Sequence, residues 1–145
     1  SFIQQNYYLS DITGETLRSY GCIMLISKQI NIEGGKVGFT QITTYMDRQL
    51  VTTEAWIGSH LVSISTCHFE SLSYSSVRQQ QLLQFKGVLE NRKKDLLPSL
   101  SLLCGDFNFC SYRNYNFHKE DLENDVLAHH LSTFQDLWSK HYGSF

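Results

Sequence analysis

Blocks of apolar and polar residues along this chain predict several strands in its first half. The run from Tyr20 to Ile26 is almost continuously apolar and predicts a central strand. The glycine-rich stretch from Ile30 to Gly38 predicts a hairpin or a loop instead. Two segments rich in Thr, Val and Ile follow, Gln49 to Ile57 and His60 to Cys67, and Gly58-Ser59 between them predicts a tight antiparallel turn.

The apolar period changes to that of a helix from Ser75 to about Arg92, and a weaker helical pattern covers Glu120 to Leu131. Between these helices, the apolar run from Ser99 to Leu103 is bounded by Pro98 and Gly105 and predicts a buried core strand. A strand-helix-strand crossover usually places the ends of both strands at the same edge of a sheet. The apolar side of the longer helix is expected to hold Val77, Leu82, Phe85, Val88 and Leu89.

Polar side chains stand where the two strands joined by this helix end. His68 follows the first strand, and Asp106 and Asn108 follow the second. Alternation in an extended chain puts Asp106 and Asn108 on one side and Phe107 on the other, so we expect His68 and Asp106 to face one crevice. The alternative is an ordinary turn at Gly105-Asp106, with His68 as a satisfied polar residue.

Composition limits the classes of protein that fit. With 145 residues and 41% hydrophobic content, the chain can bury the core of one modest domain. The net charge of -2 gives no overall field that would recruit nucleic acid, so any anion site must be local. The four cysteines form no Cys-x-x-Cys pair, which favours a reduced, intracellular compartment. No apolar stretch approaches the ~18 residues of a membrane span, so we expect no membrane contact.

Five short elements, in the same order along the chain, resemble a known superfamily. Thr66-Cys67-His68-Phe69-Glu70-Ser71 and Gly105-Asp106-Phe107-Asn108 resemble the paired strand ends of the endonuclease/exonuclease/phosphatase superfamily. Three further elements narrow the resemblance to its 5′-tyrosyl-DNA phosphodiesterase branch, and Trp138 in the last of them is expected in the core. These are Thr44-Tyr45-Met46-Asp47-Arg48, Arg78-x-x-Gln81-Leu82 and Asp136-Leu137-Trp138.

The resemblance implies an α/β (α+β) fold, as part of a four-layered α/β/β/α sandwich with mixed sheets. Residues 1–145 would then be the central portion of a single domain with both ends missing. The implied activity is a magnesium-dependent phosphodiesterase, with Mn²⁺ as a substitute, that hydrolyses 5′-tyrosyl-DNA bonds in DNA repair. The implied partner is DNA with a 5′-phosphotyrosyl end, and the implied location is the nucleus and cytoplasm.

The resemblance also assigns roles to individual residues. Asp106 would orient the attacking water and Asn108 would donate to a phosphate oxygen, while His68 and the Ser71 hydroxyl would stabilise the developing charge. The remaining motif residues would be structural. Arg78 and Gln81 would tie the long helix to the loop after His68. Arg48 fits either a structural ion pair or a phosphate contact, and we favour the structural role.

The chain departs from the family pattern in ways that leave alternatives open. The family's upstream Asn and metal-binding Glu and its downstream Ser-Asp-His have no counterpart, so no residue here is expected to bind metal. The main magnesium ligand would lie outside these residues, and the 145 residues alone are expected to be inactive. Phe69, Phe107 and Phe109 replace smaller family residues. A sphingomyelinase-like, inositol-phosphate or deadenylase enzyme and a non-catalytic module are the alternatives.

Overall fold

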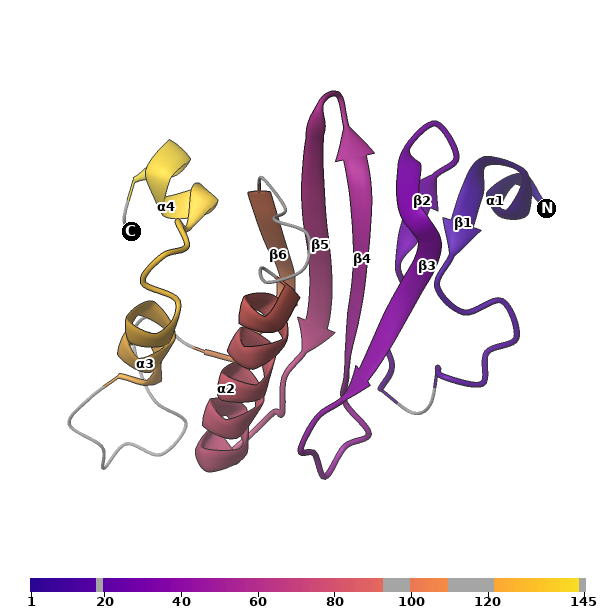
Figure 1. The fold of residues 1–145 in the computed structure, drawn as a ribbon. Coiled ribbons are helices and arrows are strands. Elements are labelled where there is room, and N and C mark those ends of the chain that lie inside the picture. Colours follow the sequence, from indigo (N-terminus) through magenta and orange to yellow (C-terminus); the bar gives the residue numbers. More distant parts are fainter. Residues whose placement is uncertain (18–19, 93–99, 110–121, 144–145) are drawn as a thin grey trace. The chain divides into compact units, whose positions relative to one another are not determined.

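The structure is a computed structural model that describes residues 1–17, 20–92, 100–109 and 122–143 (Figure 1). By its internal contacts the chain divides into two compact units, Ser1–Asn108 and Phe109–Phe145. The elements of the first unit are α1 (Phe2–Asn6), β1 (Tyr7–Leu9), β2 (Leu25–Ser27), β3 (Asn31–Gln41), β4 (Gln49–Ile57), β5 (His60–His68), α2 (Ser75–Arg92) and β6 (Leu100–Asp106).

A four-stranded sheet in the order β3-β4-β5-β6 carries the candidate site (Figure 1). β4 and β5 pair antiparallel, and Ile57 lies opposite His60 across the turn at Gly58, whose φ of 61° suits glycine. The predicted hairpin is therefore confirmed. β6 joins β5 in parallel, with Val62 opposite Leu100.

Helix α2 makes the crossover between the two parallel strands, with the bounds that the sequence predicts. Its inward side buries Val77, Leu82, Phe85 and Leu89. The ring centroids of Phe85 and Phe69 are 6.4 Å apart. Because β5 and β6 run in the same direction, their carboxyl ends meet at one edge of the mixed sheet. The predicted α/β class and mixed sheet are confirmed.

The other face of the sheet packs on a second, two-stranded sheet formed by β1 and β2. A core cluster joins Met24 and Ile26 to Val51 of β4, and Phe39 and Ile64 pack against it. The prediction of a central strand over 20–26 is wrong, since β2 begins at Leu25. Within this run Met24 and Ile26 are buried against the main sheet, whereas Tyr20, Ile23 and Leu25 are exposed, an arrangement that the apolar pattern alone does not distinguish from a central strand.

Strand β3 replaces the hairpin or loop predicted for Ile30 to Gly38. Its register against β4 shifts between Ile32 and Val37, where Gly34 and Gly35 lie. Glycine inside a strand often marks a bulge, so the pair interrupts the ladder without reversing the chain.

The prediction that the strand before Asp106 is buried is wrong as well. The side chains of β6 are mostly exposed, with Leu100 at 58% and Leu102 at 38% relative accessibility. β6 is the last strand in the sheet order and pairs only with β5 among the described strands. An apolar run predicts the strand, whereas its burial depends on what covers it.

The second unit holds α3 (Glu123–His130) and α4 (Leu137–Tyr142). α3 confirms the weaker predicted helix, although residues 120 and 121 lie outside the described part of the chain. The Asp136 side chain caps α4 by accepting from the backbone N–H groups of Trp138 and Ser139. Trp138 is 57% exposed, so the expectation that it lies in the core is wrong. None of the helices described here is long and apolar enough to cross a membrane.

Gly105 is required by the close approach of β6 to β5. A Cβ atom at this position would lie 2.1 Å from the carbonyl oxygen of Cys67, and the φ of Gly105 is +148°. Both the contact and the backbone conformation exclude a side chain. The glycine therefore keeps the two strand ends side by side.

We predict that Gly105→Ala lowers the free energy of unfolding by about 2–4 kcal/mol, because the methyl group forces the strands apart and strains the backbone. Gly87→Ala is the control, since a Cβ at Gly87 in α2 meets nothing within 4 Å. It should be neutral or stabilise by up to about 1 kcal/mol. Urea unfolding of both variants measures the difference, and equal stabilities would contradict the argument.

Candidate active site

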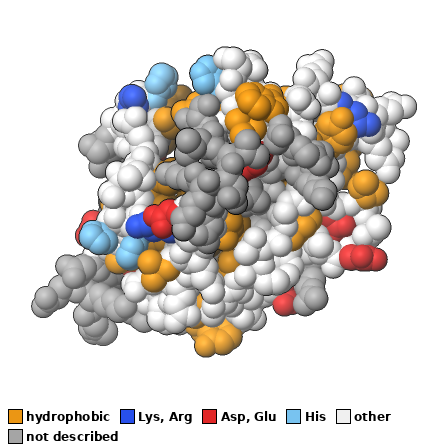
Figure 2. Space-filling view, viewed as in Figure 1, with side chains coloured by type: hydrophobic (Ala, Val, Ile, Leu, Met, Phe, Trp, Pro, Cys, Tyr) orange, Lys and Arg blue, Asp and Glu red, His pale blue; other side chains and the backbone are white. Residues whose placement is uncertain are grey.

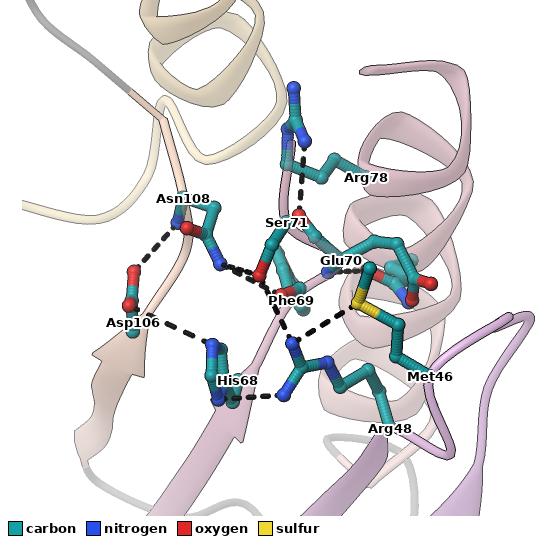
Figure 3. A network of polar contacts seen from close by, with 10 residues as sticks. Met46, Arg48, His68, Phe69, Glu70, Ser71, Arg78, Asp106 and Asn108 are labelled. Atoms are coloured by element: carbon teal, nitrogen blue, oxygen red, sulfur yellow. Dashed lines mark hydrogen bonds and ion pairs between the residues drawn. The ribbon is translucent and has the colours of Figure 1, made fainter. Parts of the chain in front are cut away.

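His68 and Asp106 lie opposite each other at the carboxyl ends of β5 and β6 (Figure 3). His68 Nε2 is 3.7 Å from Asp106 Oδ2, and the histidine side chain is 34% exposed against 64% for the aspartate. The predicted convergence of these side chains at one sheet edge is confirmed. Its cause is the parallel register that α2 and Gly105 impose.

Asn108 reaches the same place through a turn and not through strand alternation. Its φ is 54°, a left-handed conformation that asparagine tolerates, and its backbone N–H donates to Asp106 Oδ1 at 2.9 Å. Asn108 Nδ2 then donates to the carbonyl of Phe69 at 2.9 Å and to Ser71 Oγ at 3.3 Å. The expectation of an extended chain through Asn108 is wrong, yet the turn brings its amide to the site.

Ser71 lies at the centre of the polar network in Figure 3. Its Oγ accepts from Asn108 Nδ2 and, at 3.0 Å, from Arg48 Nη2. A hydroxyl has one proton and two lone pairs, so two accepted bonds leave the proton of Ser71 to donate to a further acceptor.

Arg48, for which the sequence favours a structural ion pair over a phosphate contact, joins this network through His68 and Ser71. The residue is 1% exposed, and its Nη1 lies 2.7 Å from His68 Nδ1. Its Nη2 also contacts Met46 Sδ at 3.5 Å, and the ring of Tyr20 lies 4.8 Å from its Cζ. The signal for Arg48 was the Thr44-x-Met46-x-Arg48 spacing, whereas nothing in the sequence pointed to Tyr20.

The contact with Arg48 fixes the proton on the His68 ring. A guanidinium can only donate, so Nδ1 of His68 must accept and the ring proton of the neutral imidazole lies on Nε2, facing Asp106. Burial lowers the pKa of His68 below its usual value of 6.5, and the charge of Arg48 lowers it further. Asp106 and Glu70 act in the opposite direction but do not reverse the shift. His68 is therefore a neutral hydrogen-bond donor at pH 7.

A second, buried network behind the site is centred on Glu70, which is fully buried. Its carboxylate accepts from Thr44 Oγ1 at 2.8 Å, from the Tyr45 N–H at 3.0 Å and from Gln81 Nε2 at 3.2 Å. The Glu70 N–H donates in turn to Gln81 Oε1 at 2.8 Å. The sequence analysis included Glu70 in a motif but gave it no role. In the structure its hydrogen bonds connect the loop before β4 to helix α2.

Arg78 and Gln81 have the scaffold role that the sequence predicts. Arg78 is 1% exposed and donates through Nη1 to the carbonyl oxygens of Glu70 and Leu72, at 3.0 and 2.8 Å. Gln81 Nε2 also donates to the carbonyl of Thr43 at 2.8 Å. Leu72 has a positive φ of 59°, so these bonds hold the loop after His68 in a conformation that leucine rarely adopts.

The described residues do not by themselves form a magnesium site. No group of three His, Cys, Asp or Glu side chains among them is placed to hold a metal ion. Mg²⁺ prefers several oxygen ligands, and Asp106 offers a single exposed carboxylate, while both oxygens of Glu70 already accept hydrogen bonds. What the described residues offer a ligand is hydrogen bonding, with Ser71 and His68 as donors and Asp106 as an acceptor.

We predict that Gln81→Ala destabilises the protein by about 3 kcal/mol, because it leaves the buried Glu70 N–H and Thr43 carbonyl without their partner. Gln80→Ala, the exposed neighbour on α2, should change stability by less than about 0.5 kcal/mol. Thermal or urea unfolding of the two variants tests this. A similar loss in both would show that the buried network does not set stability.

The pKa of His68 gives a pH prediction. Because the folded-state pKa lies below 6.5, the unfolded state binds more protons as pH falls through 6.5, so His68 lowers the free energy of unfolding there and adds no pH dependence well above it. NMR titration should show His68 titrating below 6.5 with the proton on Nε2. Arg48→Met should raise that pKa. A ring protonated on Nδ1 in the unmodified protein would contradict the assignment.

Comparison with known proteins shows which fold carries this site. No family model and no curated protein matches the chain. Among solved structures, TDP2 from C. elegans aligns with 20% identity and a TM-score of 0.59 over 75% of this chain and 33% of that one. D. rerio TDP2 complexed with single strand DNA product aligns with 18% identity and a TM-score of 0.53, over 74% of this chain and 41% of that one.

A beta toxin structure from Staphylococcus aureus aligns over 89% of this chain and 51% of its own, with 14% identity and a TM-score of 0.58. The chain thus spans a third to a half of the length of these proteins. At such identities the likeness shows the fold, which these proteins share as members of one superfamily. The chain is therefore built on the endonuclease/exonuclease/phosphatase fold, as its sequence resemblance implies.

Proposed function

We propose that the protein is a phosphodiesterase that acts on DNA ends and hydrolyses the bond between a 5′ phosphate and tyrosine. The observation that carries this proposal is the buried charge of Arg48. Among the described residues, the polar and ring partners of the Arg48 guanidinium are His68, Ser71, Met46 and Tyr20, and none of these is a carboxylate. A buried cation without an anionic partner is costly, and a phosphate bound at Ser71 and His68 supplies the missing negative charge.

The donors beside Arg48 suit a phosphate group. The Ser71 hydroxyl and the Nε2–H of His68 each have a proton to give, whereas the two Nδ2 hydrogens of Asn108 are already donated to the Phe69 carbonyl and to Ser71 Oγ. Fixed donors of this kind stabilise the negative charge that shifts onto phosphate oxygens in the transition state. His68 is neutral at pH 7 and still has its Nε2–H to donate, so in this proposal it can act at neutral pH.

Asp106 supplies the acceptor that the attacking water needs. Its Oδ1 accepts from the Asn108 N–H, which orients the carboxylate, and the side chain is 64% exposed. Oδ2 is thereby directed toward His68 and solvent, where a water can donate to it. In this proposal Asp106 orients the nucleophile and Asn108 fixes both Asp106 and the phosphate-facing loop.

The choice of DNA as substrate is supported by the fold neighbour TDP2 from D. rerio, whose structure is complexed with single strand DNA product. The proposal includes Mg²⁺, or Mn²⁺ in its place, held chiefly by ligands outside the described residues. It also places the activity in DNA repair, in the nucleus and cytoplasm. Because the same fold occurs in a bacterial beta toxin, other phosphodiesters are the necessary comparison.

We predict magnesium-dependent hydrolysis of a 5′-tyrosyl oligonucleotide by the full-length protein that contains these residues and supplies the metal ligands. Asp106→Asn should lower kcat about a hundredfold or more, because one acceptor oxygen becomes a donor, with a smaller effect on binding. His68→Ala should also lower kcat. His60→Ala, an exposed histidine at the tip of the β4–β5 hairpin, is the control and should leave kcat unchanged.

Sphingomyelin and an inositol phosphate are assayed beside the oligonucleotide. Activity on either of these without activity on the oligonucleotide would overturn the DNA assignment and keep the phosphoesterase. No hydrolysis of any of the three would favour a non-catalytic module. Asp106→Asn at the wild-type rate would remove the proposed role of Asp106.

A further inference from the structure

Two tyrosine rings stand together on the surface beside the candidate site. Tyr45 is 74% exposed and Tyr74 is 38% exposed, and their ring centroids are 5.3 Å apart with an interplanar angle of 57°. They come from different loops, one between β3 and β4 and the other between β5 and α2. The sequence analysis assigned neither of them a role.

Hydrogen bonds hold the backbone of both tyrosines. The Tyr45 N–H donates to the buried Glu70 carboxylate at 3.0 Å. The Tyr74 carbonyl accepts from the N–H groups of Val77 and Arg78 in the first turn of α2, each at 3.1 Å. Since these bonds fix the backbone of Tyr45 and Tyr74, a ligand that stacks on the rings binds without a large entropic cost of ordering the two loops.

The two loops that carry the rings also carry the donors of the candidate site. Ser71 precedes Tyr74 by three residues and Arg48 follows Tyr45 by three, and Arg48 Nη2 donates to Ser71 Oγ at 3.0 Å. The aromatic pair and the phosphate-facing groups are thus parts of one cross-linked structure. A ligand with a phosphate and an aromatic ring matches this juxtaposition.

Beyond the Arg48 charge at the phosphate position, electrostatics offers the rest of such a ligand little attraction. The chain has 12 Lys and Arg against 14 Asp and Glu, and Arg48 and Arg78 beside the site are each 1% exposed. In Figure 2 the Lys and Arg side chains visible on this face stand in separate small groups and form no stripe. Binding of a nucleic-acid strand therefore needs a contact other than charge, and stacking on aromatic rings is the usual one.

We propose that Tyr45 and Tyr74 form a stacking platform for a nucleobase of a single-stranded DNA end whose phosphate lies at the Ser71–Arg48 site. The inference rests on the proposed function and deepens it by assigning the contact that holds the strand. The tilt between the rings lets a base stack on one face while the edge of the other ring packs against it.

The test is binding of a 5′-phosphorylated single-stranded oligonucleotide, measured by fluorescence anisotropy in EDTA so that nothing is hydrolysed. Tyr45→Ala and Tyr74→Ala should each raise Kd about ten- to a hundredfold. Tyr45→Phe and Tyr74→Phe keep the rings and should stay within about twofold of wild type. Tyr8→Ala removes another exposed tyrosine, on β1, and should have no effect.

A second series locates the base. Three oligonucleotides are compared, each lacking the base at one of the first three positions. One of them should bind wild type more weakly than the intact oligonucleotide, and this difference in Kd should disappear in the Ala variants. Unchanged Kd in both Ala variants, or an equal loss in the Phe variants, would overturn the platform. No binding of the oligonucleotide by wild type would overturn it as well.

These outcomes separate the platform from the proposed function. Normal binding by the Ala variants together with turnover of the 5′-tyrosyl oligonucleotide would leave the enzyme without its platform. The predicted increases in Kd, without hydrolysis by wild type, would leave a DNA-binding module that uses the platform. Unchanged thermal unfolding of the Ala variants excludes misfolding as the cause of a loss.

Discussion

The burial of the Glu70 carboxylate is the constraint on which the site depends. A fully buried carboxylate is unfavourable unless its oxygens accept hydrogen bonds, and here Thr44, Tyr45 and Gln81 provide them. These donors come from the loop before β4 and from helix α2. Satisfying one charge therefore locks two distant segments against the end of β5, and it fixes where Arg48 and Ser71 must lie.

The front of the site has the opposite electrostatic arrangement. Glu70 is surrounded by donors, whereas the buried Arg48 contacts a neutral histidine, a hydroxyl, a thioether and an aromatic ring. The charge of Glu70 is thus met by donors within the protein, whereas the charge of Arg48 is the one that the proposed function pairs with a phosphate. Under the proposed function, this separation lets a chain with a net charge of -2 offer a local site for phosphate.

Hydrogen bonds at the site hold two residues in unusual backbone conformations. Asn108 and Leu72 both have positive φ values, and each lies in a loop next to the catalytic candidates. Asn108 is held by its bond to Asp106, and the carbonyl of Leu72 by the buried Arg78. Such conformations persist only when surrounding contacts determine them, so the rigid Arg78–Gln81 scaffold is part of what shapes the site.

The sequence by itself determined the elements whose signals are local. The β4–β5 hairpin follows from two Thr- and Val-rich segments around Gly58, helix α2 follows from its apolar period, and the convergence of His68 and Asp106 follows from the crossover. Only the tertiary structure decided which apolar runs are covered, that β3 continues through two glycines, and that Arg48 contacts His68. Burial and long-range contacts depend on segments far away in the sequence, so no local pattern records them.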